Sequence, residues 1–284
     1  MRVTRTWRAR WKTFIRHAAL IIVSFLMIYP ILWMFFASFK PDDQIFSTSS
    51  LIPDKWTFQH YIDGLTGRSG TNFGPMFVHS FEIACVVVIG SLFSSTITGF
   101  AFGRLEFTAR RFLFGFMLAT MMLPAQVVLI PQYIIFHKLN LINTFVPLML
   151  PSFLGTTPFF IYLMVQFVRG IPKDLDEAAE IDGCNPFRLF LYVILPLTRP
   201  ALITISIFSF YWTWNDFFGQ AIYLNNPNLF TVPIGLNMFM DNMGNSQWGD
   251  LFAMSIVSII PVVIIFVIFQ RYLVEGIATQ GLKN

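Results

Sequence analysis

The sequence predicts an all-α membrane protein with six transmembrane helices, and two observations carry this prediction. Of the 284 residues, 55% are hydrophobic and only 12% are charged, which is too apolar for a soluble domain of this length. A helix needs about 20 consecutive apolar residues to cross a hydrocarbon core about 30 Å thick. The chain offers roughly six such runs, at about residues 18–39, 76–102, 112–136, 144–168, 201–223 and 251–270.

The basic residues are concentrated on one side of these predicted spans. On that side lie Arg2, Arg5, Arg8, Arg10, Lys12, Arg16, Arg104, Arg110, Arg111, Arg169, Lys173, Arg188, Arg199, Arg271 and Lys283. The opposite loops hold only Lys40, Lys55, Arg68 and Lys138. Because cytoplasmic loops carry the excess of Lys and Arg, we expect both termini and the segment 169–200 to be cytoplasmic.

The same pattern divides the chain into three regions. We expect a basic cytoplasmic amino terminus at residues 1–17, a six-helix transmembrane domain at 18–270 and a cytoplasmic tail at 271–284. Trp7 and Trp11 are interleaved with the amino-terminal bases, which is typical of contact with anionic lipid headgroups. The net charge of +4 therefore indicates membrane lipids as partners, and we expect no nucleic acid.

A polar island, residues 171–200, separates the fourth and fifth spans. Asp174 is placed to cap a short helix, and Glu177 three residues later would complete a capping box. Gly183 predicts the left-handed turn that ends this helix. Asn185 before Pro186 predicts the start of a second helix. The island therefore predicts a helix-turn-helix at the membrane surface, with an ordinary surface loop as the alternative.

Within the first of these helices, Ala178 and Ala179 are small enough for a partner protein to approach closely. We expect Asp176, Glu180 and Asp182 to remain solvated.

The spacing of the island resembles the cytoplasmic coupling loop of ABC-importer permease subunits. The resemblance lies in Glu177-Ala178-Ala179, Gly183 and Ile194-Leu195-Pro196. In that family the loop docks into a cleft of the ATPase subunit. The resemblance therefore implies ATPase docking by Glu177, Ala178, Ala179, Asp182, Gly183, Pro186, Leu195 and Pro196.

Other stretches resemble the carbohydrate-importer, maltose-type group of these permeases. They are residues 51–61, in which His60 stands where the group commonly has Asn, residues 121–144 and the run from Trp214 to Phe217. The tail, with Gly276 and Gly281, looks like the Gly-rich terminus that reaches the ATPase dimer. The resemblance implies type I ABC-importer permease architecture in a bacterial or archaeal inner membrane. Its implied partners are a second, related permease subunit, a dimer of ABC ATPase subunits and an extracytoplasmic solute-binding protein.

Six residues are candidates for the translocation path: Glu82, Pro124, Gln126, Trp214, Asn215 and Asp216. A carboxylate inside a membrane is costly unless it is paired or wet, so Glu82 either forms a structural hydrogen bond or lines the path. Pro124 near the middle of the third span predicts a kink. Aromatic and polar groups at residues 214–216 suit sugar binding, and an interfacial aromatic belt with a capped helix end explains them equally well.

One face of the second span carries only small side chains. The residues on this face are Gly90, Ser91, Ser94, Ser95, Thr98, Gly99 and Gly103. Small residues let helices pack backbone to backbone in lipid. The face predicts a packing seam, either within this subunit or against a second one.

These features together predict the permease subunit of a binding-protein-dependent ABC importer for a sugar or oligosaccharide. A separate subunit would hydrolyse ATP, coupled through the loop from Glu177 to Gly183, so we expect no enzymatic chemistry, metal or cofactor in this chain. The alternatives are a permease for a non-sugar solute such as glycerol phosphate, a stand-alone secondary transporter and an intramembrane enzyme. The small number of charged residues in the spans argues against a secondary transporter. The histidines lack the spacing of metal ligands, which argues against an intramembrane enzyme.

Overall fold

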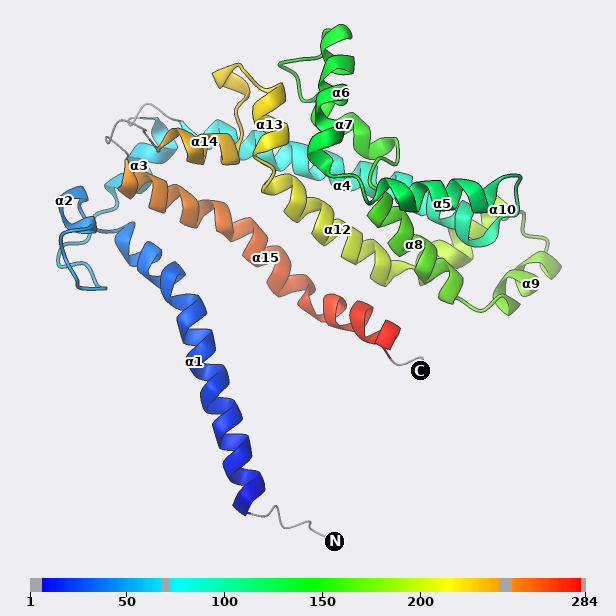
Figure 1. Cartoon of the computed structure of the whole chain (residues 1–284), viewed down its shortest axis with the longest axis horizontal. Helices are drawn as coiled ribbons and strands as arrows, with labels where there is room; N and C mark the ends of the chain where they lie inside the picture. Colours follow the sequence, from blue (N-terminus) through cyan, green and yellow to red (C-terminus); the bar gives the residue numbers. More distant parts are fainter. Residues whose placement is uncertain (1–6, 68–71, 241–246, 282–284) are drawn as a thin grey trace. The chain divides into compact units, whose positions relative to one another are not determined.

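A computed structural model describes residues 7–67, 72–240 and 247–281, and within these ranges the regular structure is entirely helical. Figure 1 shows the elements. They are α1 (Trp7–Ala37), α2 (Asp42–Ile45), α3 (Gln59–Thr66), α4 (Phe73–Arg104), α5 (Arg110–Thr120), α6 (Ala125–Lys138), α7 (Val146–Phe153), α8 (Pro158–Gly170), α9 (Asp174–Ile181), α10 (Pro186–Arg188), the π-helix η1 (Leu189–Ile194), α11 (Leu195–Leu197), α12 (Arg199–Trp214), α13 (Phe218–Tyr223), the 3-10 helix η2 (Pro227–Leu229), α14 (Val232–Met238) and α15 (Trp248–Gly281). The all-α prediction is confirmed.

The chain divides into two compact units. One comprises Met1–Phe73 with Met238–Val257, and the other comprises Gly74–Asn237 with Ser258–Asn284. The predicted docking loop and translocation-path residues all belong to the second unit. The first unit contains α1, α2, α3 and the beginning of α15.

All six predicted apolar runs fall on helices, but several helices are interrupted. Among the described residues, four stretches are long and apolar enough to cross a membrane: Trp11–Ala37, Phe73–Arg104, Val146–Gly170 and Trp248–Gln270. A fifth is obtained if Pro186–Leu197 and Arg199–Trp214, bent by 74°, are counted as one span.

The third predicted run is a broken helix. Pro124 has extended backbone (ψ 134°) between α5, of 11 residues, and α6, of 14 residues. Each half is shorter than the roughly 20 residues that a straight crossing needs. The kink predicted at Pro124 is therefore a complete interruption, because proline supplies no N–H to continue the α5 ladder.

The small-residue face of α4 packs against α7 and α8 of the same chain. A Cβ added at Gly90 would meet Ser152, one at Gly99 would meet Met164, and one at Gly103 would meet Val168. The Ser94 hydroxyl also donates a hydrogen bond of 2.6 Å to the Ser152 carbonyl. The predicted packing seam is therefore confirmed, and these contacts of α4 are made within this subunit.

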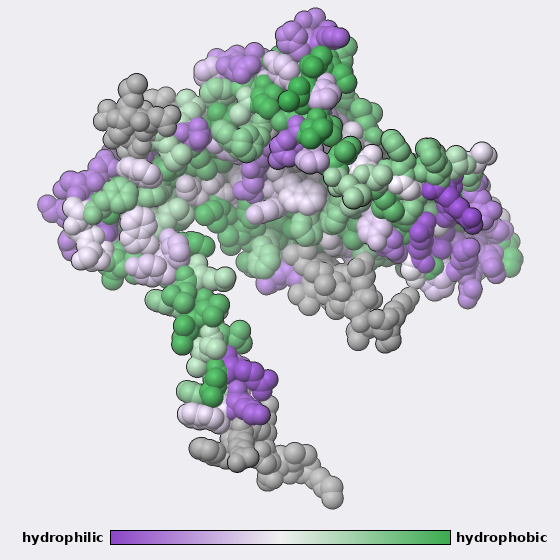
Figure 2. Space-filling view, viewed as in Figure 1, coloured by the Kyte–Doolittle hydropathy of each residue, from purple (hydrophilic) through white to green (hydrophobic). Residues whose placement is uncertain are grey.

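The hydrophobic core of the second unit joins the long helices to the polar island. Its buried members come from α4, α8, α9, η1 and α12, and they are Phe100, Phe160, Met164, Val168, Ala179, Leu189, Ile194, Ala201 and Ile205. Figure 2 shows hydrophilic residues gathered over α9 and α10, whereas α5 is largely hydrophobic. The island is thus polar outside and anchored in an apolar core inside.

Candidate docking loop and translocation path

Helix α9 begins one residue earlier than a cap at Asp174 requires. Its N-cap is Lys173, which makes no side-chain capping hydrogen bond. The Lys173 carbonyl instead accepts from the backbone N–H groups of Asp176 (2.8 Å) and Glu177 (3.1 Å). The predicted capping box is therefore wrong. With Asp174 already inside the first turn, the acidic side chains interact with the positive end of the helix dipole rather than with capped N–H groups.

The end of α9 at Gly183 follows the prediction. Gly183 adopts φ +79°, its N–H donates to the Glu180 carbonyl (3.0 Å), and the Cys184 N–H donates to the Ala179 carbonyl (2.9 Å). This pair of bonds is a Schellman motif, which needs a residue in the left-handed region. Glycine adopts that region without a Cβ penalty, so Gly183 reverses the chain sharply after one short helix.

The second helix of the island also begins as predicted. The Asn185 side chain accepts a hydrogen bond from the Arg188 N–H (2.8 Å), and Pro186 occupies the first turn. The chain then widens into the π-helix η1, in which the Leu195 N–H bonds to the Phe190 carbonyl. Pro196 follows without an N–H. The chain bends by 74° into α12. We call residues 174–197, which connect α8 to α12, the elbow.

Most of the predicted docking residues are accessible. Within the elbow, the exposed ones are Glu177, Ala178, Asp182, Gly183, Pro186 and Pro196. Leu195 is half-buried, and Ala179 is 7% exposed in the hydrophobic core. The small side chain of Ala179 therefore lets α9 pack against this chain, while Ala178 is exposed. Close approach of a partner to α9 stays a prediction.

Asp176 is not solvated, contrary to the prediction. Its side chain is 16% exposed, and Oδ2 lies 2.9 Å from Nε of Arg104, whose side chain is 5% exposed. Arg104 is the last residue of α4. A basic residue at the end of one span and an acidic residue in the island were visible in the sequence, but their pairing depends on the tertiary packing of α4 beside α9. Glu180 and Asp182 are exposed as expected.

Three of the candidate path residues lie outside the lining of two grooves that flank α12. Glu82 is exposed on α4, and Pro124 and Gln126 are exposed at the break between α5 and α6. None of them lines the two grooves beside α12. A path role for these three residues stays a prediction.

The run from Trp214 to Asp216 lies at the end of α12. Trp214 is 2% exposed, and its indole N–H donates to the Ser258 carbonyl (3.0 Å). Asp216 Oδ1 accepts from the Gly219 N–H (3.0 Å) at the start of α13. The first bond anchors the indole, and the second satisfies an N–H in the first turn of α13 from a position one residue before the N-cap Phe217.

Trp214 and Asn215 also line a groove of about 280 Å³. Its other walls are Tyr211, Val232, Pro233, Leu236, Ser258, Ile259 and Val262. Tyr211 and Asn215 are exposed, so aromatic and amide groups face the same space. The groove therefore combines the two kinds of group that sugar sites use, while Asp216 lies outside its lining.

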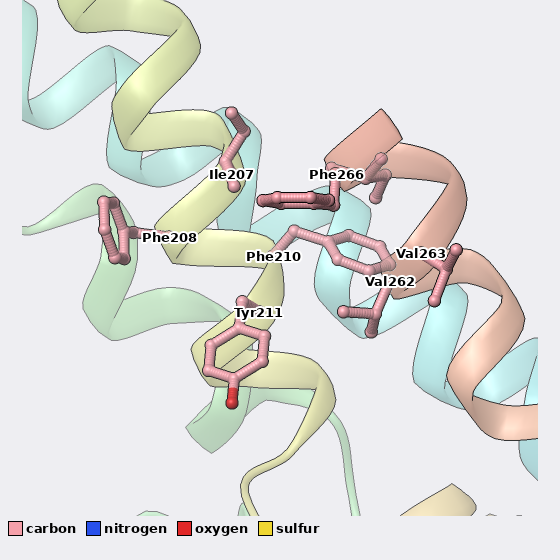
Figure 3. A pocket seen from close by; sticks show the side chains of 8 residues that line it. Ile207, Phe208, Phe210, Tyr211, Val262, Val263 and Phe266 are labelled. Atoms are coloured by element: carbon pink, nitrogen blue, oxygen red, sulfur yellow. The ribbon is translucent and has the colours of Figure 1, made fainter. Parts of the chain in front are cut away.

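A second groove, of about 360 Å³, lies between α12 and the part of α15 after Ser258. Figure 3 shows Phe208 and Tyr211 on α12, and Val262, Val263 and Phe266 on α15. Apart from the Tyr211 hydroxyl, the labelled side chains are hydrocarbon. A surface of this kind suits lipid chains or another apolar helix rather than a polar solute.

A buried polar cluster in the first unit was not predicted as a site. His60 is 7% exposed, with Nδ1 2.9 Å from Asp250 Oδ1 and Nε2 2.9 Å from the Lys40 carbonyl oxygen. Lys40 is 1% exposed, and its ammonium donates to Thr48 Oγ1 (3.1 Å) and the Ser50 carbonyl (2.5 Å). The sequence signal was the histidine at an Asn position, but its acidic partner is 190 residues away in the chain.

The structure describes only part of the carboxyl-terminal tail. Helix α15 continues as far as Gly281, so Gly276 and Gly281 lie on helical backbone rather than in a loop. Side-chain surroundings beyond Gln270, and residues 282–284 altogether, lie outside the described part. Contact of this tail with an ATPase dimer stays a prediction.

Comparisons with known proteins identify the family. Residues 95–279 match the family described as binding-protein-dependent transport system inner membrane component. The arabinooligosaccharides transport system permease protein AraQ of Halalkalibacterium halodurans is 33% identical, covering 92% of this chain and 93% of the relative. The galactooligosaccharides permease GanQ of Bacillus subtilis is 34% identical (93% and 93%), and the trehalose/maltose permease MalG of Thermococcus litoralis is 31% identical (93% and 94%).

The fold is that of a solved ABC importer. A chain of a bacterial ABC transporter involved in the import of the acidic polysaccharide alginate superimposes with a TM-score of 0.82 at 22% identity, over 94% of this chain and 98% of that chain. The type I permease architecture predicted from the coupling-loop resemblance is confirmed. This chain is a multi-pass inner membrane protein that belongs to the family of binding-protein-dependent transport system inner membrane components.

Proposed function

We propose that this permease subunit carries a sugar or oligosaccharide across the membrane. Transport is coupled to ATP hydrolysis through the part of the elbow that contains α9, Gly183 and α10. The observation that carries the proposal is the two-sided character of this elbow. Glu177 and Gly183 are exposed on its outside, and Ala179 is buried in a core shared with α4, α8 and α12. A partner bound outside therefore acts on a body packed against the long helices.

Coupling requires the docked elbow to interact differently with two states of the partner. On ATP binding, the two ATPase subunits would close and carry α9 with them. Because protein interiors are close-packed and transmit strain, displacement of Ala179 moves the other members of its core, which include Leu189 and Val168. The long helices then change their tilt, and the path opens to the opposite side of the membrane.

The sugar class is supported by the relatives' names, which specify arabinooligosaccharides, galactooligosaccharides and trehalose/maltose. The groove lined by Tyr211, Trp214 and Asn215 supports the same class through its exposed members Tyr211 and Asn215, since aromatic faces pack on the apolar faces of sugar rings while amides hydrogen-bond hydroxyls. The proposed partners are a second permease subunit, two ATPase subunits that bind ATP, and an extracytoplasmic solute-binding protein. The chain itself performs no covalent chemistry, and its elbow and termini face the cytoplasm.

The test is transport by the assembled complex. The chain is purified with its partner subunits, and the solute-binding protein is titrated with arabinooligosaccharides, galactooligosaccharides, diacetylchitobiose, maltose, trehalose and glycerol phosphate. The bound compound is then offered to proteoliposomes loaded with ATP. We expect uptake of a saccharide only when all subunits and ATP are present. Uptake by this chain alone contradicts ATP coupling, and selective binding of glycerol phosphate contradicts the sugar class.

A further inference from the structure

One arginine connects the end of α4 to both sides of the junction between α8 and α9. Arg104 Nη2 donates to the Ile171 carbonyl (2.8 Å), at the end of α8, and Nε lies 2.9 Å from Asp176 Oδ2, in the first turn of α9. The Nε contact is an ion pair without hydrogen-bond geometry, and Asp176 Oδ1 has no hydrogen-bond partner among the described residues. Arg104 is therefore the group that compensates this largely buried carboxylate.

The end of α4 that carries Arg104 is fixed by other contacts. Arg110 donates to the carbonyls of Phe102 (2.6 and 3.1 Å) and Gly103 (3.3 Å), which lie in the last turn of α4. Cations near the last carbonyls satisfy them and interact favourably with the helix dipole. A Cβ at Gly103 would collide with Val168 of α8. Arg104 thus projects from a rigid point of the seam between α4 and α8.

Helix α9 also has an apolar attachment to the unit, through Ala179 in the core. Apolar contacts are non-directional and allow a short helix to slide or rotate over its neighbours. A guanidinium is planar and presents donors in a fixed fork, so it holds the position of α9 relative to α4. The sequence of contacts runs from the exposed Glu177 through Asp176 and Arg104 to the seam.

We propose that Arg104 is a positioning residue that makes α4 move together with α9 when the elbow is displaced. This rests on the proposed docking of the elbow. The ion pair conveys the displacement to the face of α4 that packs on α7 and α8, at Gly90, Gly99 and Gly103. The apolar core, to which α4 contributes Phe100, conveys the displacement to α4, α8 and α12 without a directional contact.

The test replaces the pair by apolar residues of similar size, Arg104→Met with Asp176→Leu, because such exchanges retain packing and remove buried charge. Asp174→Asn is the matched control, since Asp174 is an exposed acid in the same first turn. For the complete transporter, three quantities are measured: abundance in the membrane, co-purification of the ATPase subunits, and stimulation of ATP hydrolysis by the solute-loaded binding protein.

We expect the double variant to keep its abundance and its ATPase subunits but to lose stimulation about 5-fold or more, the lower end of typical coupling effects. The Asp174→Asn variant should keep all three. Stimulation of the double variant equal to that of the control would overturn the proposal, leaving the pair a packing feature. Failure of docking itself is recognised separately, because it abolishes co-purification of the ATPase subunits, which the proposed role of Arg104 leaves intact.

A distance measurement provides a second test that needs no change to the pair. Spin labels are placed at Asp174→Cys on α9 and Glu106→Cys just beyond α4, both exposed positions, after Cys85 and Cys184 are replaced by serine. If α9 and α4 move together, the distance between the labels is the same in nucleotide-free and ATP-bound transporter. A distance that changes on ATP binding overturns the proposal, whether or not the double variant folds.

Discussion

His60 Nδ1 lies 2.9 Å from Asp250 Oδ1, while its Nε2 lies 2.9 Å from the Lys40 carbonyl oxygen. Both partners are acceptors, and neutral imidazole has only one N–H to donate. The imidazolium form alone satisfies both contacts. The first turn of α15 is thus joined to α3 and to the segment after α1 by a histidine that is best satisfied when charged.

The stability of the first unit should therefore depend on pH. Burial lowers the pKa of His60, but the hydrogen bonds to Asp250 and to the Lys40 carbonyl and the charges of Asp42 and Asp250 outweigh it, so the pKa lies above its ordinary value of 6.5. A raised folded-state pKa stabilises the fold fully below the unfolded value of about 6.5, and this stabilisation is lost as pH rises through the folded value.

Thermal denaturation of the detergent-solubilised chain across this window measures the effect. We expect the midpoint to fall as pH rises, and His60→Asn to remove that dependence because the amide does not titrate. His137→Asn, at an exposed histidine of α6, is the control and should leave the dependence unchanged. A pH profile of His60→Asn that matches the wild-type protein contradicts the prediction.

Replacing Gly183 by valine should disable the elbow. Nothing lies within 4 Å of the Cβ position, so the difficulty is only the φ of +79°, which costs an L-residue about 1–2 kcal/mol and more when it is β-branched. We expect normal membrane insertion with loss of ATPase co-purification. Gly115→Val is the matched control, because its Cβ also meets nothing within 4 Å and its φ is ordinary. Retained co-purification in Gly183→Val contradicts the docking role.

A methyl group at Gly103 should destabilise the seam between α4 and α8. Its Cβ would collide with Val168, whose β-branched side chain has little freedom to move, and overpacking of this kind costs about 1–3 kcal/mol. Lower abundance and a lower denaturation midpoint are expected for Gly103→Ala. Gly115→Ala in α5 should show neither, and equal behaviour of the two variants would rule out a tight seam.

Asp216→Ala separates a capping role from a path role. Loss of the acceptor for the Gly219 N–H should cost about 1 kcal/mol, as for other helix caps, and reduce abundance. Because Asp216 lies outside the lining of the groove that contains Trp214 and Asn215, the solute concentration for half-maximal uptake should not change. Asp216→Asn, which keeps an acceptor, should restore abundance. A changed half-maximal concentration in either variant would assign Asp216 to the path.

The sequence predicted those parts of the elbow whose structure depends only on residues close in the chain. The turn at Gly183 and the cap at Asn185 are set by backbone geometry within a few positions, and both follow from the sequence. The start of α9 was predicted one residue too late, because no local signal shows whether Lys173 or Asp174 is the N-cap. Likewise, the face of Gly90, Gly99 and Gly103 predicted a seam without naming its partner.

Contacts between distant segments account for what the sequence did not predict. Asp176 was expected in water because acidic residues usually are, and only the placement of Arg104 explains its burial. The same holds for His60 and Asp250. For Trp214 and Asp216, the hydrogen-bond partners establish a structural role, and a role in the path stays a prediction.

The π-helix η1 has a consequence for tolerance to length changes. Its i→i+5 bond from Leu195 to Phe190 accommodates one residue more than an α-helical turn would. Deleting a single residue between Leu189 and Ile194 closes this turn to ordinary α geometry, and because the π turn already absorbs the extra residue, the preceding elbow keeps its direction relative to α12. A deletion within α12, which has ordinary α geometry, instead rotates the preceding elbow by about 100°. Gly183 and Glu177 then face a different direction, so loss of one residue is tolerated in η1 but changes the exposed face of the elbow when it occurs in α12.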